Sequence, residues 1–417
     1  MTSVMLPPWP VFEHDELDAV QAVLRSGSVN YWSGSACRDF EAAWSQAHRA
    51  GSSRPLHSLA MANGSLTMDA VLRVLGIGPG DEVIVSPRSY VASAMCVMLA
   101  GATPVFADVD PESGCITAET AEAVRSERTR AVIPVHIGGW PCDMPSIARW
   151  AAEHGIRVLE DCAQAHGAHV AGQPVGTFGT FASWSFCQDK IITTGGEGGM
   201  LCTPDEALHA RCWAFAQHGK DMHVAKGGPS PEGPGRFQWL VHHEGTNLRM
   251  TEMQAAIGLR QLAKLPTWVE TRRRNSLIMQ EALREVAGLR VPKTPDGHAH
   301  YRCVAFVETS DAPAVRNRLL DALSTAGIIG MHGSCSEIYR EQAFQSRGFT
   351  PASMGRGSLD SDGRLPNARR LGETSLTFLV HHTIDEATMR RYADAARSCI
   401  ERALSGRVMP SRPSAVA

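Results

Sequence analysis

The chain has 417 residues, which is long enough for one large domain with a substantial core and a second, smaller domain. Hydrophobic residues make up 43% of it and charged residues 20%, which is typical of a globular protein. The net charge of −3 favours neither a nucleic acid nor an anionic membrane as a partner.

The N-terminal stretch MTSVMLPPWP has no basic region followed by an apolar run, so it does not resemble a secretory signal peptide. No apolar stretch approaches the roughly 18 residues that a membrane span needs. The eleven cysteines include no CxxC pair, and this odd number without regular spacing suggests reduced thiols packed in a core. We therefore expect a cytoplasmic protein that does not contact a membrane.

Predicted strands and helices alternate from residue 57 onward. The predicted strands are residues 57–62, 82–86, 103–109, 130–136, 157–161, 181–186 and 198–203. The predicted helices are residues 63–76, 90–101, 117–126 and 144–155. Asn63 is a suitable N-cap for the first of these helices, and Gly76 is a suitable stop. This alternation predicts an α/β fold with a mainly parallel sheet and helices on both faces.

The pattern changes after residue 204. Residues 223–239 are rich in Gly and Pro and predict a long loop. Residues 251–286 predict long helices that lead into a second domain with strands at 301–308 and 375–380 and a helix at 385–404. The predicted division is a large domain with an N-terminal helical segment at 1–260, a small C-terminal α+β domain at 261–405, and a disordered tail at 406–417.

A lysine with unusual surroundings stands in the stretch SFCQDKIITTGGEGGM, residues 185–200. Lys190 follows a predicted buried strand that ends at Ser185, and glycines that permit close backbone approach come after it. Asp161 and Gln164 lie at the end of another strand. Ligands of open α/β sheets bind at the carboxyl ends of the strands. A carboxylate, an amide, a hydroxyl and an amine are therefore expected to converge at one edge of the sheet.

This set of groups suits pyridoxal 5′-phosphate (PLP). A desolvated lysine amine such as that of Lys190 can form a Schiff base with an aldehyde cofactor. The cofactor needs an anion beside its ring nitrogen, a role for Asp161, and an amide near its phenolic oxygen, a role for Gln164.

The phosphate of such a cofactor also needs donors, and its ring benefits from an aromatic neighbour. The backbone of Gly64 and Ser65 at a predicted helix N-terminus, together with Ser185, could supply the donors. Tyr90 follows a strand, where its ring could stack on the cofactor, and a place in the core is the alternative for it.

Five motifs in order resemble the DegT/DnrJ/EryC1/StrS family: ANGSLTMDAVLRVLGIGPGDEVIVSPRSYVAS, PVHIGGWPCDM, VLEDCAQAHGA, SFCQDKIITTGGEGGM and GTNLRMTEMQAAIGLRQL. The resemblance implies a PLP-dependent aminotransferase for keto sugars or cyclitols, with the fold type I architecture of aspartate aminotransferase. It implies that residues 1–260 bind PLP, that Lys190 is the Schiff-base lysine, and that Asp161 and Gln164 contact the ring. It further implies that Asn247, and less directly Arg249, reaches the phosphate in the neighbouring subunit, which makes a homodimer with shared sites.

Two positions depart from the family pattern, and several histidines have open roles. Ser65 replaces a frequent threonine and keeps the hydroxyl, whereas Thr180 replaces a common aspartate and receives no role. One family branch has histidine in place of the lysine and catalyses dehydration, and Lys190 argues against that branch. His166 is either a neighbour of the cofactor or a packed core residue. The pairs at 242–243 and 381–382 lack ligand spacing, so no metal is expected, although one of these histidines could line the substrate pocket.

The expected reaction moves an amino group from L-glutamate or L-glutamine to a keto sugar with ping-pong kinetics. The resemblance favours a nucleotide-linked 4-keto-6-deoxy or 3-keto sugar made for a polysaccharide or a glycosylated metabolite. A cyclitol or other unactivated ketone is the alternative acceptor, because residues 298–303, 334–344 and 379–382 look somewhat like cyclitol-type and aminohydroxybenzoate-type members. A non-catalytic auxiliary protein that retains the PLP fold is the alternative from another class.

Overall fold

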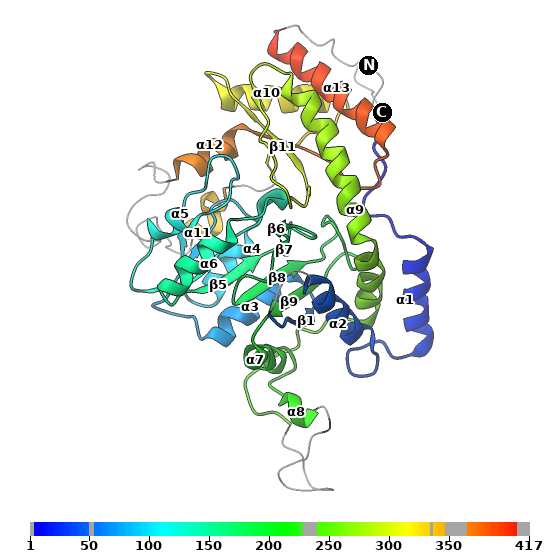
Figure 1. The fold of residues 1–417 in the computed structure, drawn as a ribbon, viewed down its shortest axis with the longest axis vertical. Helices are drawn as coiled ribbons and strands as arrows, with labels where there is room; N and C mark the ends of the chain where they lie inside the picture. Colours follow the sequence, from blue (N-terminus) through cyan, green and yellow to red (C-terminus); the bar gives the residue numbers. More distant parts are fainter. Residues whose placement is uncertain are drawn as a thin grey trace.

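The computed structural model describes residues 4–49, 54–225, 227, 240–333, 337–346 and 365–406. At its centre is a seven-stranded sheet in the order β1-β9-β8-β5-β4-β2-β3 (Figure 1). Its strands are β1 (His57–Met61), β2 (Glu82–Val85), β3 (Thr103–Phe106), β4 (Thr129–Ile133), β5 (Arg157–Asp161), β8 (Phe181–Ser185) and β9 (Gly199–Thr203). β9 pairs antiparallel with both β1 and β8, and the other pairs of neighbouring strands in this sheet are parallel. The predicted α/β fold with a mainly parallel sheet is confirmed.

Helices cover both faces of this sheet. Alternate side chains of a strand pack against the helices on opposite faces. On β8, Phe181 packs in the cluster that includes α3 and α4, whereas Trp184 packs with α2 and α9 on the other face. This alternation follows from the two-residue period of a strand. The helices of this part are α1 (His14–Ser26), α2 (Ala36–His48), α3 (Gly64–Leu75), α4 (Ala92–Leu99), α5 (Ala118–Glu122), α6 (Met144–Glu153), α7 (Glu206–Ala216) and α8 (Met222–Ala225).

The ends of α3 are set by the residues that the sequence singled out. The Asn63 side chain accepts a hydrogen bond from Leu66 N at 3.0 Å, and Gly76 adopts the left-handed conformation with φ of 71°. α5 is shorter than predicted. Ser126 Oγ donates to Glu82 Oε2 at 2.5 Å, and this contact ties the chain to the start of β2 instead of letting the helix continue.

A single 33-residue helix, α9 (Glu252–Arg284), replaces the several helices predicted over 251–286. It contains Pro266 and runs from the large sheet to a second layer (Figure 1). That layer has an antiparallel sheet of β10 (Leu289–Arg290), β11 (Cys303–Val307) and β12 (Ser375–Phe378) with α10 (Ala312–Thr325) and α13 (Glu386–Leu404). The smaller elements are β6 (His169–Val170), β7 (Gln173–Pro174), α11 (Gln342–Ser346), α12 (Pro366–Thr374) and the 3-10 turns η1 (Ile137–Gly139) and η2 (Ile338–Arg340).

The predicted domain boundary, loop and tail remain predictions. α9 passes through residue 260 without a break, and the division into domains at that residue stays a prediction. The predicted loop at 223–239 and the predicted tail at 406–417 lie largely outside the described residues. Within the described ranges, no helix has both the length and the apolar character that crossing a membrane requires.

Glu160 on β5 is a buried carboxylate that organises the chain before β8. Its oxygens accept backbone hydrogen bonds from Gly176, Phe178 and Gly179 at 2.7, 2.8 and 2.6 Å. Charge-assisted bonds of this kind are stronger than neutral ones, and a buried donor left without a partner is costly. Glu160 therefore holds the loop from which β8 enters the sheet.

Glu160 also lies close to His136 and Cys162, and ligand atoms of the three residues lie within 4.8 Å of one another. His136 Nδ1 accepts a hydrogen bond from Cys142 N at 3.0 Å, so the hydrogen of the neutral ring is on Nε2. That nitrogen faces Glu160 Oε2 at 3.4 Å. The hydrogen bonds of His136 and Glu160 explain why these side chains lie together, so we interpret the cluster as part of the fold.

We expect Glu160→Ala to lower the free energy of unfolding by about 3 kcal/mol or more, because three buried N–H groups lose their acceptor. Urea denaturation followed by circular dichroism measures this change. Glu153→Ala, at an exposed position of α6, is the matched control and should change it by less than about 0.5 kcal/mol. Equal stability of the two variants would contradict this role of Glu160.

Candidate active site

Asp161 ends β5 and is only 4% exposed. Its Oδ2 accepts a hydrogen bond from Ser93 Oγ at 2.7 Å, and its Oδ1 accepts one from Ala163 N at 3.1 Å. Ser93 N in turn donates to the backbone oxygen of Tyr90 at 3.2 Å. The first turn of α4 therefore holds the Asp161 carboxylate and sets the backbone position of Tyr90.

Gln164 is 5% exposed and has a fixed orientation. Its Oε1 accepts a hydrogen bond from Gly138 N at 2.7 Å. Gly138 has φ of 63°, a left-handed conformation that glycine adopts without strain. This bond joins the loop after β4 to the loop after β5, and so it brings two carboxyl ends of the sheet together.

The N-terminus of α3 approaches the end of β8 closely. A Cβ atom at Gly64 would lie 2.9 Å from Ser185 Cβ and 3.0 Å from the Trp184 carbonyl oxygen. On the adjacent strand, a Cβ at Gly199 would lie 2.4 Å from the Asn63 carbonyl oxygen. The first N–H groups of a helix have no partner within it and favour an anion. The structure thus brings the backbone of Gly64 and Ser65 beside the hydroxyl of Ser185.

A hydroxyl pair that the sequence analysis missed stabilises this contact. Thr67 Oγ1 lies 2.5 Å from Ser183 Oγ and donates to the Gly64 carbonyl oxygen at 2.6 Å. Both side chains are buried. Thr67 lies three residues after Gly64 on α3, and this helical spacing was the available signal.

Lys190 reaches the same edge through a short turn. Cys187 N donates to Ser185 Oγ at 3.3 Å, and Lys190 N donates to the Cys187 carbonyl oxygen at 3.1 Å. The Lys190 side chain is 14% exposed. Its Nζ lies 3.3 Å from Asp189 Oδ1 and 5.4 Å from the centre of the Tyr301 ring. The amine is thus largely withdrawn from water and lies beside a carboxylate and an aromatic ring.

Asp189 is a further site residue that the sequence analysis did not select. Its Oδ2 accepts a hydrogen bond from Tyr301 OH at 2.5 Å and lies 3.9 Å from Arg302 Nη2. Burial alone would raise the pKa of Asp189, but the charge of Lys190 and the Tyr301 hydrogen bond outweigh it and hold this pKa below its usual value. Tyr301 and Arg302 lie in HAHYRC, which the sequence analysis used only for its overall likeness.

The remaining predicted residues differ in how the structure places them. Tyr90 is 67% exposed, which argues against its alternative place in the core. Asn247 is exposed and directly precedes Leu248, whose carbonyl oxygen accepts a hydrogen bond at 2.9 Å from Ala62 N, just after β1. Its contribution to a neighbouring subunit, like that of Arg249, stays a prediction.

His166 is a packed core residue, and it lies close enough to Lys190 for the lysine charge to act on its ring. It is fully buried and packs against the rings of Trp44, Trp184 and Phe186. Burial lowers its pKa to about 3, so the ring is neutral near pH 7. The packed position that the sequence left open for this histidine is confirmed, and its contact with the cofactor stays a prediction.

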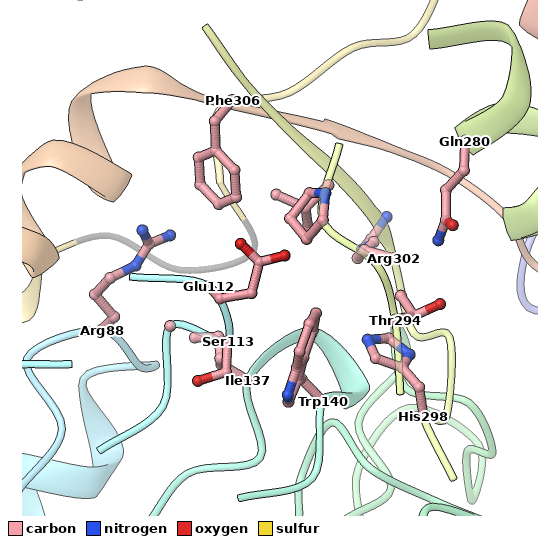
Figure 2. A pocket seen from close by; sticks show the side chains of 14 residues that line it. Arg88, Glu112, Ser113, Ile137, Trp140, Gln280, Thr294, His298, Arg302 and Phe306 are labelled. Atoms are coloured by element: carbon pink, nitrogen blue, oxygen red, sulfur yellow. The ribbon is translucent and has the colours of Figure 1, made fainter. Parts of the chain in front are cut away.

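A cavity opens between the carboxyl ends of the large sheet and the face of β11. Figure 2 shows Arg88 and Glu112 on one side of it, Arg302, Thr294 and His298 on the other, and Trp140 below them. Gly138, which Gln164 holds, also lines it. The cavity therefore adjoins the cluster around Asp161.

Comparison with known proteins gives the family. The sequence model of the DegT/DnrJ/EryC1/StrS aminotransferase family matches residues 10–394. The chain belongs to this family. The aminotransferases of this family are PLP-dependent enzymes of fold type I.

Two curated relatives and one solved structure illustrate the family likeness. A UDP-N-acetyl-3-dehydro-alpha-D-glucosamine 3-aminotransferase of Acidithiobacillus ferrooxidans is 35% identical over 72% of this chain and 77% of its own. An L-glutamine:2-deoxy-scyllo-inosose aminotransferase of Streptomyces kanamyceticus is 31% identical over 94% of each chain. The crystal structure of an aminotransferase from Psychrobacter cryohalolentis superposes with a TM-score of 0.86 at 41% identity, over 96% of this chain and 99% of that one.

The residues of this chain fit the cofactor of the family. The contact between Gly64 and Ser185 leaves no room for a side chain beside the α3 N-terminus, as an anion cradle formed by backbone requires. Asp161 is a buried carboxylate with fixed hydrogen bonds, and Lys190 is a shielded amine. Such a donor set matches a phosphate, a pyridinium nitrogen and an aldehyde respectively.

We expect Gly64→Ala to raise the dissociation constant for PLP by about tenfold or more. The added methyl group overpacks the contact with Ser185 and Trp184, and overpacking typically costs ~1–3 kcal/mol. Equilibrium dialysis of the apoprotein against PLP measures this change. Gly78→Ala is the control, because its nearest neighbour, the Ala100 carbonyl oxygen, would lie at an ordinary 3.5 Å. Unchanged affinity in Gly64→Ala would contradict the cradle.

Proposed function

We propose that this aminotransferase moves an amino group from L-glutamate or L-glutamine to a nucleotide-linked keto sugar for a polysaccharide or a glycosylated metabolite. The observation that carries the proposal is the shielded Lys190 amine at the same sheet edge as the buried Asp161 carboxylate. The UDP-sugar relative from Acidithiobacillus ferrooxidans supports a nucleotide-linked acceptor. The cavity of Figure 2 is lined by Arg88 and Trp140, a cationic and an aromatic group that suit a charged sugar derivative.

A cyclitol or other unactivated ketone is the second candidate acceptor. The Streptomyces kanamyceticus relative, which is named for such an acceptor and for glutamine as donor, matches nearly the whole chain. Part of the likeness to cyclitol-type members falls on residues 334–336, which lie outside the described residues.

We assign the cofactor contacts as follows. Asp161 pairs with the ring nitrogen, Gln164 lies near the phenolic oxygen, and Tyr90 offers its exposed ring as a stacking surface. Ser185 and the backbone of Gly64 and Ser65 bind the phosphate. When bound, PLP supplies a ring that withdraws electrons from the reacting carbon.

Lys190 moves the proton. Its Nζ takes the proton from Cα of the amino-acid donor in the first half-reaction. In the second half-reaction it gives a proton to the former keto carbon of the acceptor, which bears the amino group in the product. A neutral amine is needed for the first step. The Lys190 side chain is 14% exposed, so the amine is largely shielded from water at the position where it would act. The turn at Ser185 and Cys187 limits the reach of the amine to this edge of the sheet.

We further propose that the active unit is a cytoplasmic homodimer in which Asn247 of each subunit completes the phosphate site of the other. The exposure of Asn247 supports a role outside its own subunit. Symmetric dimers are the commonest oligomers of proteins.

We expect Lys190→Ala to abolish transamination while the fold is retained. The variant lacks the amine that bonds to the cofactor and moves the proton, so the visible absorbance of the holoenzyme should not respond to L-glutamate or L-glutamine. Circular dichroism monitors the fold. Lys293→Ala, at an exposed lysine, should behave like the wild type. Undiminished turnover in Lys190→Ala would contradict the assignment, and loss of turnover without loss of the cellular phenotype would favour an auxiliary protein.

We expect a mixture of Lys190→Ala and Asn247→Ala subunits to recover activity that neither variant has alone. In a mixed dimer, one site combines an intact Lys190 with an intact Asn247 from the partner. An equal mixture that exchanges subunits freely should regain about a quarter of the wild-type activity. No recovery, with exchange shown by mass spectrometry, would place Asn247 in the site of its own subunit.

A further inference from the structure

A second cavity, which Asp189 and Tyr301 help to line, has a volume of about 350 Å³. This volume lies within the range of small-molecule binding sites. Its polar lining consists of Trp9, Gln188, Asp189, Arg272, Tyr301, Arg302 and His381, and the rest of its lining is apolar. Arg302 lines this cavity and also the cavity of Figure 2, where it stands with Thr294 and His298.

Arg272, on α9, is a buried cation for which the described residues contain no anionic partner. Its exposed fraction is 2%, and its Nε has no hydrogen-bond acceptor. The guanidinium donates only to the Tyr301 carbonyl oxygen, at 3.4 Å, and lies 5.5 Å from the centre of the Trp9 ring. Burial lowers its pKa to about 9, which still leaves it charged at neutral pH. A buried charge without a counterion is costly, and so the cavity favours an anion.

Arg302 has unused donors as well. Its side chain is 17% exposed and makes no hydrogen bond within the described ranges. Its guanidinium lies 4.8 Å from the centre of the Tyr301 ring, and its one close carboxylate is Asp189, at 3.9 Å. A guanidinium presents a planar set of donors that suits a carboxylate in two-point contact.

The charges around the cavity do not balance. Asp189 is the only carboxylate among the lining residues, and it is shared with Lys190 and Tyr301. His381 adds no negative charge, because burial and the nearby Arg272 lower its pKa to about 3 and leave it neutral. The two arginines therefore leave an excess of positive charge within reach of Lys190.

We propose that Arg302, with Arg272 behind it, binds the α-carboxylate of the amino-acid donor. This inference rests on the proposed function. Lys190 Nζ must reach the donor Cα, and the α-carboxylate is bonded to that atom. Since Lys190 and Arg302 both contact Asp189, at 3.3 and 3.9 Å, a ligand bound at Arg302 lies next to the lysine. The donor carboxylate supplies the anion that the cavity lacks, and a keto-sugar acceptor has no α-carboxylate to place there.

The two half-reactions, measured separately on the holoenzyme by visible spectroscopy, test the assignment. We expect Arg302→Gln to raise the L-glutamate concentration for half-maximal rate by about tenfold or more, through loss of a charge-assisted contact. The half-reaction with the keto acceptor should change by less than about twofold. Arg302→Lys, which keeps the charge, should recover part of the loss. Arg273→Gln is the control, since Arg273 is exposed and pairs with Glu270.

Calorimetric titration with 2-oxoglutarate adds a readout that does not depend on turnover. Binding should weaken by about tenfold in Arg302→Gln and remain unchanged in Arg273→Gln. An unchanged donor requirement in Arg302→Gln would overturn the inference. So would an equal loss in both half-reactions, which would indicate that Arg302 binds an anionic group of the acceptor. If 2-oxoglutarate binding depends on Arg302 although no ketone is aminated, the carboxylate site stands and the proposed acceptor is wrong.

Discussion

The site depends on the close approach between the N-terminus of α3 and the ends of β8 and β9. Glycine at 64 and 199 permits this contact, because a Cβ at either position would collide with Ser185 or with the Asn63 backbone. Asn63 starts the helix at that point, and the Thr67–Ser183 hydroxyl pair fixes its first turn. The helix N–H groups, the Ser185 hydroxyl and the turn that carries Lys190 thereby share one edge of the sheet.

Two adjacent carboxylates on β5 show how one strand serves both stability and chemistry. Neighbouring side chains of a strand point to opposite faces. Glu160 points to the loop before β8, where its oxygens accept hydrogen bonds from three backbone N–H groups. Asp161 is directed to α4, where Ser93 holds it. The first carboxylate stabilises the strand that carries Ser185, and the second remains as the buried anion of the site.

Local sequence predicted the elements whose signals are local. The strand that ends at Asp161, the N-cap at Asn63 and the stop at Gly76 follow from short apolar runs and capping residues. α7, α10 and α12 were not predicted. α9 was expected as several helices, because Pro266 and the many charged residues of this helix gave no continuous amphipathic pattern.

The same contrast between local and distant signals holds for the residues of the site. Its members before and after Lys190 could be named from motif order, and the family match agrees with that resemblance. Ser93, Asp189 and Arg302 could not be selected, because their importance arises from contacts between distant segments. Asp189 meets Tyr301 across 112 positions of the chain, and Ser93 meets Asp161 across 68. His166 illustrates the converse, a motif residue whose position in the sequence did not reveal that it is fully buried.

Under the proposed function, Lys190 moves the Cα proton of an amino-acid donor. Proton NMR of L-glutamate in D₂O with the PLP-loaded protein tests it without any keto acceptor. We expect the Cα–H signal to disappear with the wild-type protein and to persist with Lys190→Ala. A signal that persists with wild-type protein whose bound PLP is confirmed by its visible absorbance, for L-glutamine as well as L-glutamate, would contradict it.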